Sequence, residues 1–373
     1  MNEGTDSKLI SQGSYGCVYK PGLRCNSKDK LKKNEITKLQ VINRFSLKEM
    51  EISEKIISEI KDYKRYFAPI KTSCKIDIKE VGEKIRECKV IEDQEEMFIL
   101  NKMDNAGSKT LITALFENKT KSKSLYLRTY FVTLMSVLDG VEKLNNINII
   151  HLDIKGNNIM YSSAHKNPIL IDFGLSIDLD NYKKQRDDVF FTYGADYEPW
   201  CIDLGIITYI IEEKIEEYEV TERMIEKHIM KVVNDYVDNN TGILEKHREK
   251  LREKLMEYFS NKFLGKKFKD IIEEMVKYAK TWDLHSVVVM YNSFIINAIE
   301  DDKNIKGLIN DFDEYITSTP DKRLDIKKLR EKMQEHYNKI MLNEKESIKS
   351  LNETKGEEIE QKLTKKSLKT PTN

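Results

Sequence analysis

One stretch of the 373-residue sequence, His151-Leu152-Asp153-Ile154-Lys155-Gly156-Asn157-Asn158, decides how the rest is interpreted. Asp153 could accept a hydroxyl proton, Lys155 could neutralise a phosphate, and Asn158 could hold a metal with its amide oxygen. Fourteen residues after Asn158, Asp172-Phe173-Gly174 ends an apolar run, and its carboxylate is a second hard-oxygen ligand suited to Mg²⁺. A base, a charge clamp and two metal ligands are the parts that phosphoryl transfer requires.

Composition limits the class of protein. Charged residues make up 34% of the chain and hydrophobic residues 39%, and the 63 basic and 63 acidic side chains give a formal net charge of zero. This balance excludes the strongly basic signature of many nucleic-acid binders, so direct nucleic-acid binding is not expected. No apolar run approaches the roughly 18–20 residues of a membrane helix, and the start lacks the regions of a signal peptide. We therefore expect no membrane partner.

The five cysteines have irregular spacing and are Cys17, Cys25, Cys74, Cys88 and Cys201. In a chain of this length the spacing does not indicate a disulfide framework, and no Cys-x-x-Cys or Cys/His pairing indicates a metal site. Unpaired thiols are expected, in a reducing, intracellular and cytoplasmic compartment.

Apolar patterning predicts a strand-rich part followed by a helical part. Short β-type runs and turns occupy about residues 8–105, with a helical period over 49–60 and a natural linker at 105–107. A long amphipathic helix is predicted over 125–144, followed by two short strands. Further on we expect surface helices over the Glu- and Lys-dense residues 212–281, more helix over 282–338, and a frayed or disordered charged tail.

A two-glycine turn, Gly13-Ser14-Tyr15-Gly16-Cys17-Val18, adds to the first motif. Alone it is the pattern of an ordinary hairpin, although such turns also bring backbone N–H groups close to phosphate oxygens. Together with the motifs at 151–158 and 172–174, it resembles the eukaryotic-type protein kinase family over about residues 8–338. The resemblance implies an α+β, bilobal protein-kinase-like fold with ATP between the lobes. Its parts would be a β-rich N-lobe at 1–105, a helical C-lobe at 106–338 with a helical insertion at about 200–281, and a charged tail at 339–373.

The resemblance assigns roles by position. Asp153, Lys155 and Asn158 become the catalytic residues, and Asn158 and Asp172 become the ligands of Mg²⁺. Lys155 is also the family's mark of serine/threonine specificity. The other positions implied to contact the nucleotide are Ile10, Ser11, Gly13, Gly16, Val18, Lys38, Glu49, Met103 and Asp172.

The lysine that holds the ATP phosphates is assigned to Lys38, because Ile36-Thr37-Lys38-Leu39 has alternating strand character. Its expected partner is Glu49, since apolar residues follow at core-facing offsets, while Glu51 stays open as the alternative. The Asp that anchors the catalytic loop from a buried helix is expected at Asp283, with Asp203 as its rival.

Other supporting roles follow from the same resemblance. Arg323, in Thr319-Pro320-Asp321-Lys322-Arg323, is expected to pair with Glu198. A threonine that bridges the base and Lys155 is expected at Thr192 in preference to Thr208. His151 is expected to support the backbone of the catalytic loop rather than react.

Some positions depart from the family pattern. Leu152 replaces the Arg that reads an activation-loop phosphate, which implies activity without that switch. Ser11 stands where the first loop Gly belongs, and the usual Ala-Pro-Glu is not visible. The phrases at 13–21 and 281–283, with the abundance of Lys, Asn and Ile, resemble kinases of large cytoplasmic DNA viruses, for which host cytoplasm or the virion would be the location.

The resulting expectation is a serine/threonine-protein kinase that transfers phosphate from ATP to protein hydroxyls. One alternative is a small-molecule kinase of the aminoglycoside or choline type, which shares the His-x-Asp-x-x-x-x-Asn spacing. The other is a pseudokinase that acts as a binding scaffold, for which the degraded Ala-Pro-Glu region, Leu152 and Ser11 argue. Retention of the base and metal positions argues against the scaffold.

Overall fold

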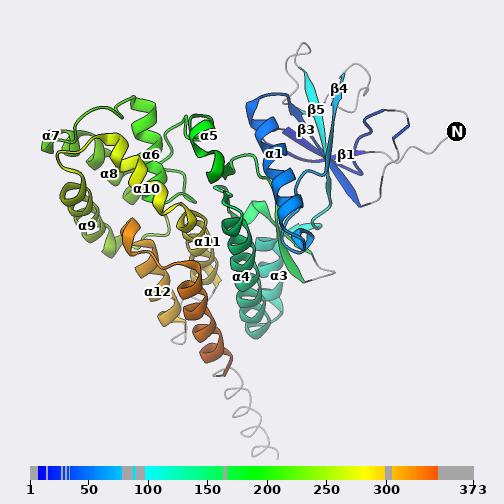
Figure 1. The fold of residues 1–373 in the computed structure, drawn as a ribbon. Helices are drawn as coiled ribbons and strands as arrows, with labels where there is room; N and C mark the ends of the chain where they lie inside the picture. Colours follow the sequence, from blue (N-terminus) through cyan, green and yellow to red (C-terminus); the bar gives the residue numbers. More distant parts are fainter. Residues whose placement is uncertain are drawn as a thin grey trace, which may run out of the picture.

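The computed structural model describes residues 7–13, 16–26, 28–29, 32, 34–77, 87–89, 97–162, 166–298 and 305–342. The tip of the glycine turn, Ser14-Tyr15, and the charged end from 343 onward lie outside the described residues. The chain forms a bilobal α+β arrangement, with a sheet at one end and helices at the other (Figure 1). This agrees with the predicted fold class.

The N-terminal part is an antiparallel five-stranded sheet with the order β1-β2-β3-β5-β4. β1 is mostly exposed at the edge of the sheet, whereas β5 is buried on both faces over most of its length. The longest pairing joins β3 and β5, in which Lys38 lies opposite Asn101. The strands are β1 (Lys8–Gly13), β2 (Gly16–Lys20), β3 (Glu35–Val41), β4 (Thr72–Ile76) and β5 (Phe98–Asp104).

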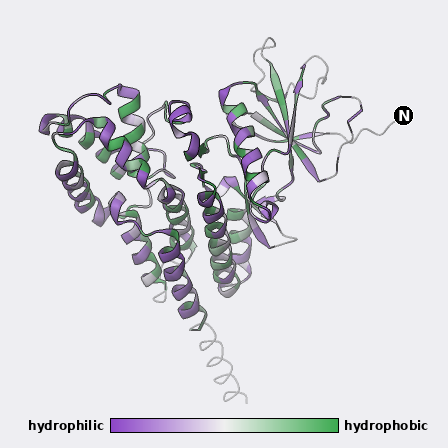
Figure 2. Ribbon diagram, in the orientation of Figure 1, coloured by the Kyte–Doolittle hydropathy of each residue, from purple (hydrophilic) through white to green (hydrophobic). Residues whose placement is uncertain are grey.

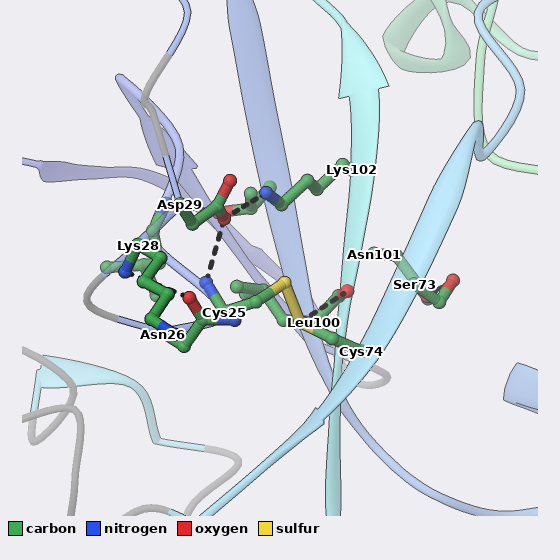
Figure 3. The surroundings of a disulfide bond; sticks show 11 residues. Cys25, Asn26, Lys28, Asp29, Ser73, Cys74, Leu100, Asn101 and Lys102 are labelled. Atoms are coloured by element: carbon green, nitrogen blue, oxygen red, sulfur yellow. Dashed lines mark hydrogen bonds and ion pairs between the residues drawn. A yellow bond between two sulfur atoms is a disulfide. The ribbon is translucent and has the colours of Figure 1, made fainter.

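Two disulfides fasten this sheet, and the prediction of unpaired cysteines is wrong for four of the five. Cys17 of β2 is bonded to Cys88, and Cys25 is bonded to Cys74 of β4. Figure 3 shows the second bond beside Asp29, whose carboxylate accepts from the Cys25 amide at 3.0 Å. The pairs lie 71 and 49 residues apart, so no local spacing motif marks them. The argument for a reducing compartment no longer holds, because it depended on unpaired thiols.

The core under the sheet is small, which gives the disulfides a structural role. Small cores in secreted or mini domains are commonly reinforced by such cross-links because the buried apolar area alone is limited. The buried members of this core are Cys17, Tyr19, Leu23, Leu39, Cys88, Phe98 and Leu100. Since two of its seven buried members are cysteines joined to each other, the Cys17–Cys88 bond is part of the core itself.

The first part of the helical region packs two helices against two short sheets. The helix predicted at 125–144 is α4 (Lys123–Asn146), which packs against α3 (Leu111–Lys121). The stripe predicted on α4 is buried, including Tyr130, whose hydroxyl donates to the Tyr291 carbonyl at 2.9 Å. The short strands are β6 (Lys109–Thr110), β8 (Ile159–Ser162) and β9 (Asn167–Leu170) in one sheet, and β7 (Ile149–Ile150) and β10 (Ile177–Asp178) in the other.

The remaining helices enclose a second, larger core. They are α5 (Tyr182–Val189), α6 (Ile202–Glu213), α7 (Glu222–Met224), α8 (Met230–Asn239), α9 (Glu245–Phe263), α10 (Phe268–Lys277), α11 (Trp282–Ala298), α12 (Lys306–Ile316) and a helix over residues 326–342. Helix α11 is buried over most of its length, and α6 is apolar on nearly every face. Among the described residues, no helix is both long and apolar enough to cross a membrane.

The expectation of surface helices over 212–281 agrees with the structure, in which these helices expose charged residues and bury an apolar side. In Figure 2 the helices of this block mix purple and green residues, and α9 is mostly purple. Apolar residues such as Val233 of α8, Phe259 of α9 and Ile271 of α10 are fully buried and continue the main core. Charged residues fill the positions between the buried ones, as in an amphipathic surface helix.

Candidate active site

Lys38 connects three parts of the site. It projects from β3 and is buried, with its Nζ 3.0 Å from Glu49 Oε2 and 2.9 Å from Asp172 Oδ1. Burial lowers the pKa of Lys38, but the charges of Glu49 and Asp172 outweigh that effect and the net shift of the pKa is upward. The ammonium is therefore held charged between the N-terminal sheet and the helical part.

Helix α1 (Arg44–Glu59) places Glu49 opposite that lysine. The helix begins at Asn43, whose side chain accepts from the backbone N–H groups of residues 45 and 46. Ile52 and Ile56 are buried on the same face as Glu49, as the offsets predicted, while Glu51 is exposed. The structure thus pairs Lys38 with Glu49 and leaves Glu51 in solvent.

The glycine turn lies between β1 and β2, where Gly13 is paired with Gly16. A Cβ on Gly16 would lie 2.5 Å from the Leu39 carbonyl oxygen, so only glycine fits there. Of the other residues implied to contact the nucleotide, Ile10 and Ser11 are exposed on β1 and Val18 is half-buried on β2. Met103 is buried near the end of β5.

The predicted catalytic loop follows β7 directly. Asp153 is buried, and its Oδ2 accepts from Asn158 Nδ2 at 2.6 Å, while its Oδ1 lies 2.9 Å from Lys155 Nζ. Asn158 also donates to the backbone carbonyl of Asp153 at 3.0 Å. His151 is fully buried, and its Nδ1 accepts from the Asp153 amide at 3.3 Å. The three predicted catalytic residues therefore lie together, with His151 behind them.

A buried carboxylate on α11 holds the backbone of this loop. Asp283 accepts from the amides of His151 at 2.7 Å and Leu152 at 2.9 Å. Leu152 has φ of 63°, a left-handed conformation that costs free energy in a non-glycine residue and has to be stabilised by its surroundings. Burial raises the pKa of Asp283, partly offset by His151 and the two amides. The structure gives the anchoring position to Asp283 and not to Asp203.

Asp172 comes just after β9 and also has a left-handed backbone, with φ of 63°. Burial raises its pKa, but Lys38 outweighs this and the net shift of the pKa is downward, so the carboxylate stays ionised. The next residue, Phe173, is buried between the rings of His151 at 4.9 Å and Phe67 at 6.1 Å. Phe173 thereby fixes the position of Asp172 relative to the catalytic loop.

Asn158 and Asp172 also fit the ligand preference of Mg²⁺. The amide nitrogen of Asn158 is directed to Asp153, so its amide oxygen is the atom offered to a ligand. The bonds that Lys38 and the Gly174 amide make to Asp172 both use Oδ1, so Oδ2 is offered in the same way. The described residues contain no cluster of three His, Cys, Asp or Glu that would form a metal site alone. Two protein oxygens completed by phosphate and water suit Mg²⁺.

Tyr197 is the site residue that sequence reasoning missed. Its hydroxyl bonds to Asp153 Oδ1 and to Lys155 Nζ, the latter at 2.8 Å. The predicted bridging threonine is wrong at both positions, because Thr192 is exposed and Thr208 donates to the Leu204 carbonyl within α6. A short hydroxyl side chain was the expected bridge, whereas the structure has a phenol in that position.

The predicted pairing of Arg323 with Glu198 is also wrong. Arg323 binds Asp203 on α6, while Glu198 accepts from the Thr241 hydroxyl. A sequence signal for Asp203 did exist, because this carboxylate lies within the apolar run 201–211, and a buried charge requires a partner.

Comparison with known proteins decides the family. Residues 5–197, more than half of the chain, match the family model described as the protein kinase domain. The chain belongs to the protein kinase family. Two relatives named calcium-dependent protein kinase 4, from Plasmodium berghei (strain Anka) and Plasmodium falciparum (isolate 3D7), are 24% and 23% identical over 216 residues. These matches cover 55% of this chain and 36% of each relative, so the chain spans about a third of their length.

One similar solved structure is titled "Crystal structure of a Stt7 homolog from Micromonas algae soaked with ATP". It has 13% sequence identity and a TM-score of 0.33, and the match covers 47% of this chain and 52% of that chain. In this protein kinase, the region matched to the family ends at 197, yet the catalytic loop is held by Asp283. Helix α11, which lies beyond the match, therefore contributes to the candidate site.

Proposed function

We propose that this protein kinase transfers the γ-phosphate of ATP to serine or threonine hydroxyls of protein substrates, with Mg²⁺. The observation that carries the proposal is the position of Lys38, whose ammonium is paired with Glu49 and Asp172 at once. This arrangement presents one cation toward the nucleotide phosphates and one carboxylate toward a metal. It supports a competent kinase better than a scaffold, in which no such pairing is required.

In the proposed reaction, Asp153 orients the acceptor hydroxyl and receives its proton. The hydroxyl oxygen forms a bond to the γ-phosphorus as the bond between that phosphorus and the ADP oxygen breaks. Lys155, 2.9 Å from Asp153, stabilises the negative charge that develops on the transferred group. When bound at Asn158 and Asp172, Mg²⁺ supplies charge neutralisation for the phosphates.

Serine/threonine specificity is supported by Lys155, which follows Asp153 by two residues and lies against it. The narrower relationship to kinases of large cytoplasmic DNA viruses is supported only by the sequence phrases at 13–21 and 281–283. The serine/threonine specificity and the viral relationship are both proposed from resemblance to the corresponding kinases.

The test is transfer of radiolabelled γ-phosphate from ATP with Mg²⁺ to an acidic protein, casein, and a basic protein, histone, followed by phosphoamino-acid analysis. We expect label on serine or threonine in the wild type, and a loss of at least about 100-fold in Asp153→Asn and in Asp172→Ala. Asp187→Asn is the matched control, since Asp187 is an exposed carboxylate on α5 that is paired with Arg186.

Four outcomes would contradict the proposal. Unchanged transfer in Asp153→Asn would exclude Asp153 as the base. Label found only on phosphotyrosine would exclude the serine/threonine assignment. Stabilisation of the chain by nucleotide without transfer to protein would indicate a pseudokinase scaffold, and transfer to a sugar or amine alcohol alone would indicate a small-molecule kinase.

A further inference from the structure

Both the hydroxyl and the ring of Tyr197 contact residues of the predicted catalytic loop. Its hydroxyl meets both Asp153 and Lys155, and Lys155 Nζ also lies 5.4 Å from the centre of its ring. A lysine ammonium can only donate, so the phenol oxygen accepts from Lys155 and the phenol proton is donated to Asp153. The donor and acceptor roles of all three groups are therefore fixed.

The Asp153 carboxylate is consequently held on both oxygens. Asn158 Nδ2 donates to Oδ2 at 2.6 Å, and the Tyr197 hydroxyl donates to Oδ1. A carboxylate with one bonded oxygen can still rotate about its terminal bond, which is a broad torsion. With a partner on each side, the plane of the carboxylate is set before any acceptor arrives.

Tyr197 is itself held in place from the catalytic loop. Its ring meets the Trp200 ring edge-on, with centroids 5.3 Å apart, and Trp200 Nε1 donates to the Leu152 carbonyl at 2.7 Å. Backbone bonds from Tyr197 to Gly194 at 3.1 Å and from Trp200 to Tyr197 at 2.8 Å close the loop. A Cβ on Gly194 would lie 2.8 Å from the Trp200 ring, so glycine is needed for this packing.

We propose that Tyr197 is a positioning residue that sets the orientation of Asp153 and the distance of Lys155 from it. This inference rests on the proposed function, because it assigns Tyr197 a part in the same transfer. Positioning errors of about 1 Å at a reacting group can reduce a rate about 100-fold, so loss of one hydroxyl here has a measurable effect.

The test uses Tyr197→Phe, which removes the hydroxyl and retains the ring that packs on Trp200. The control is Tyr193→Phe, since the Tyr193 hydroxyl lies in the same segment but donates to Asp235 at 2.7 Å. For Tyr197→Phe we expect kcat for casein or histone phosphorylation to fall about 10–100-fold. We expect its KM for ATP and its melting temperature to stay close to those of the wild type, and Tyr193→Phe to retain wild-type kcat.

A double-mutant cycle adds a readout that a structural role would not change. In a Lys155→Met background, Tyr197→Phe should cost less than it does in the wild type, because one of the two groups that the phenol positions is then absent. Additive effects would overturn the proposal, as would wild-type kcat in Tyr197→Phe or an effect on KM for ATP alone. Phosphate on Tyr197 after turnover would also overturn it, because the hydroxyl would then be an acceptor. If the wild type transfers nothing to either protein, the proposed function fails instead.

Discussion

Arg323 and Asp203 form an ion pair that is almost completely buried, with side chains 1% and 0% exposed and Arg323 Nη1 3.1 Å from Asp203 Oδ1. Trp282 Nε1 donates to the same oxygen at 3.1 Å. The pair therefore joins α6, the start of α11 and the segment after α12. Because α11 carries Asp283, this polar contact lies directly behind the support of the catalytic loop.

Removing one partner of this pair should be strongly destabilising. We expect Arg323→Ala to lower the free energy of unfolding by about 3–5 kcal/mol, because Asp203 would remain as a buried charge without its counter-ion. Denaturant unfolding measures the change. Arg252→Ala is the control, since its partners Glu249 and Asp238 are 78% and 56% exposed, and it should cost about 1 kcal/mol or less. Equal losses in the two variants would contradict this prediction.

The two neighbouring glutamates of α1 allow a matched test of the lysine pair. Glu49→Gln removes the charge that holds Lys38, so we expect a rise in KM for ATP and a fall in kcat that together reduce kcat/KM at least about 10-fold. Glu51→Gln changes an exposed residue on the same helix and should retain wild-type kinetics. Steady-state kinetics with casein or histone distinguishes them. A larger effect for Glu51→Gln would reverse the assignment.

The disulfide next to the glycine turn should affect nucleotide binding. Cys17→Ser combined with Cys88→Ser opens a cross-link between residues 71 apart, which lowers stability by about 4 kcal/mol on the unfolded-chain entropy model. We also expect several-fold weaker binding of ATP by calorimetry, because Cys17 follows Gly16 directly. The matched variant that combines Cys25→Ser with Cys74→Ser should also lose stability, but its affinity for ATP should change less than that of the Cys17→Ser, Cys88→Ser variant. Five reactive thiols in the denatured, unreduced chain would show that neither bond forms.

His285 should contribute to acid unfolding. Its Nε2 lies 3.0 Å from the Tyr236 hydroxyl, and burial lowers its pKa from 6.5 to about 3. A depressed pKa in the folded state means that the unfolded chain binds the proton first, so stability is lost as pH falls below 6.5 toward 3. The contribution is about 1.4 kcal/mol per pH unit in that window. The free energy of unfolding of His285→Gln should therefore fall less steeply than that of the wild type between pH 6 and pH 4. Parallel plots of unfolding free energy against pH for the two proteins would contradict this prediction.

The parts of the site that lie close together in sequence could be predicted, because the loop carrying Asp153 and Asn158 encodes its geometry locally. Lys38 and Glu49 could be placed from strand alternation and helical offsets. The Cys17–Cys88 bond, the partner of Arg323 and the hydroxyl of Tyr197 could not, because each depends on how distant segments pack. For the cysteines, four of five within the first 90 residues was the one available signal, and irregular spacing obscured it.

The anchoring of the catalytic loop has a consequence for synthesis of the chain. Asp283 is 132 residues beyond the His151 amide that it holds, so the loop leaves the ribosome long before its support exists. Without the bond from its amide to Asp283, Leu152 is not held in its left-handed backbone conformation during that interval. The nascent chain should thus be inactive while most of its kinase motifs are already synthesised, and activity should appear only once α11 has emerged and docked.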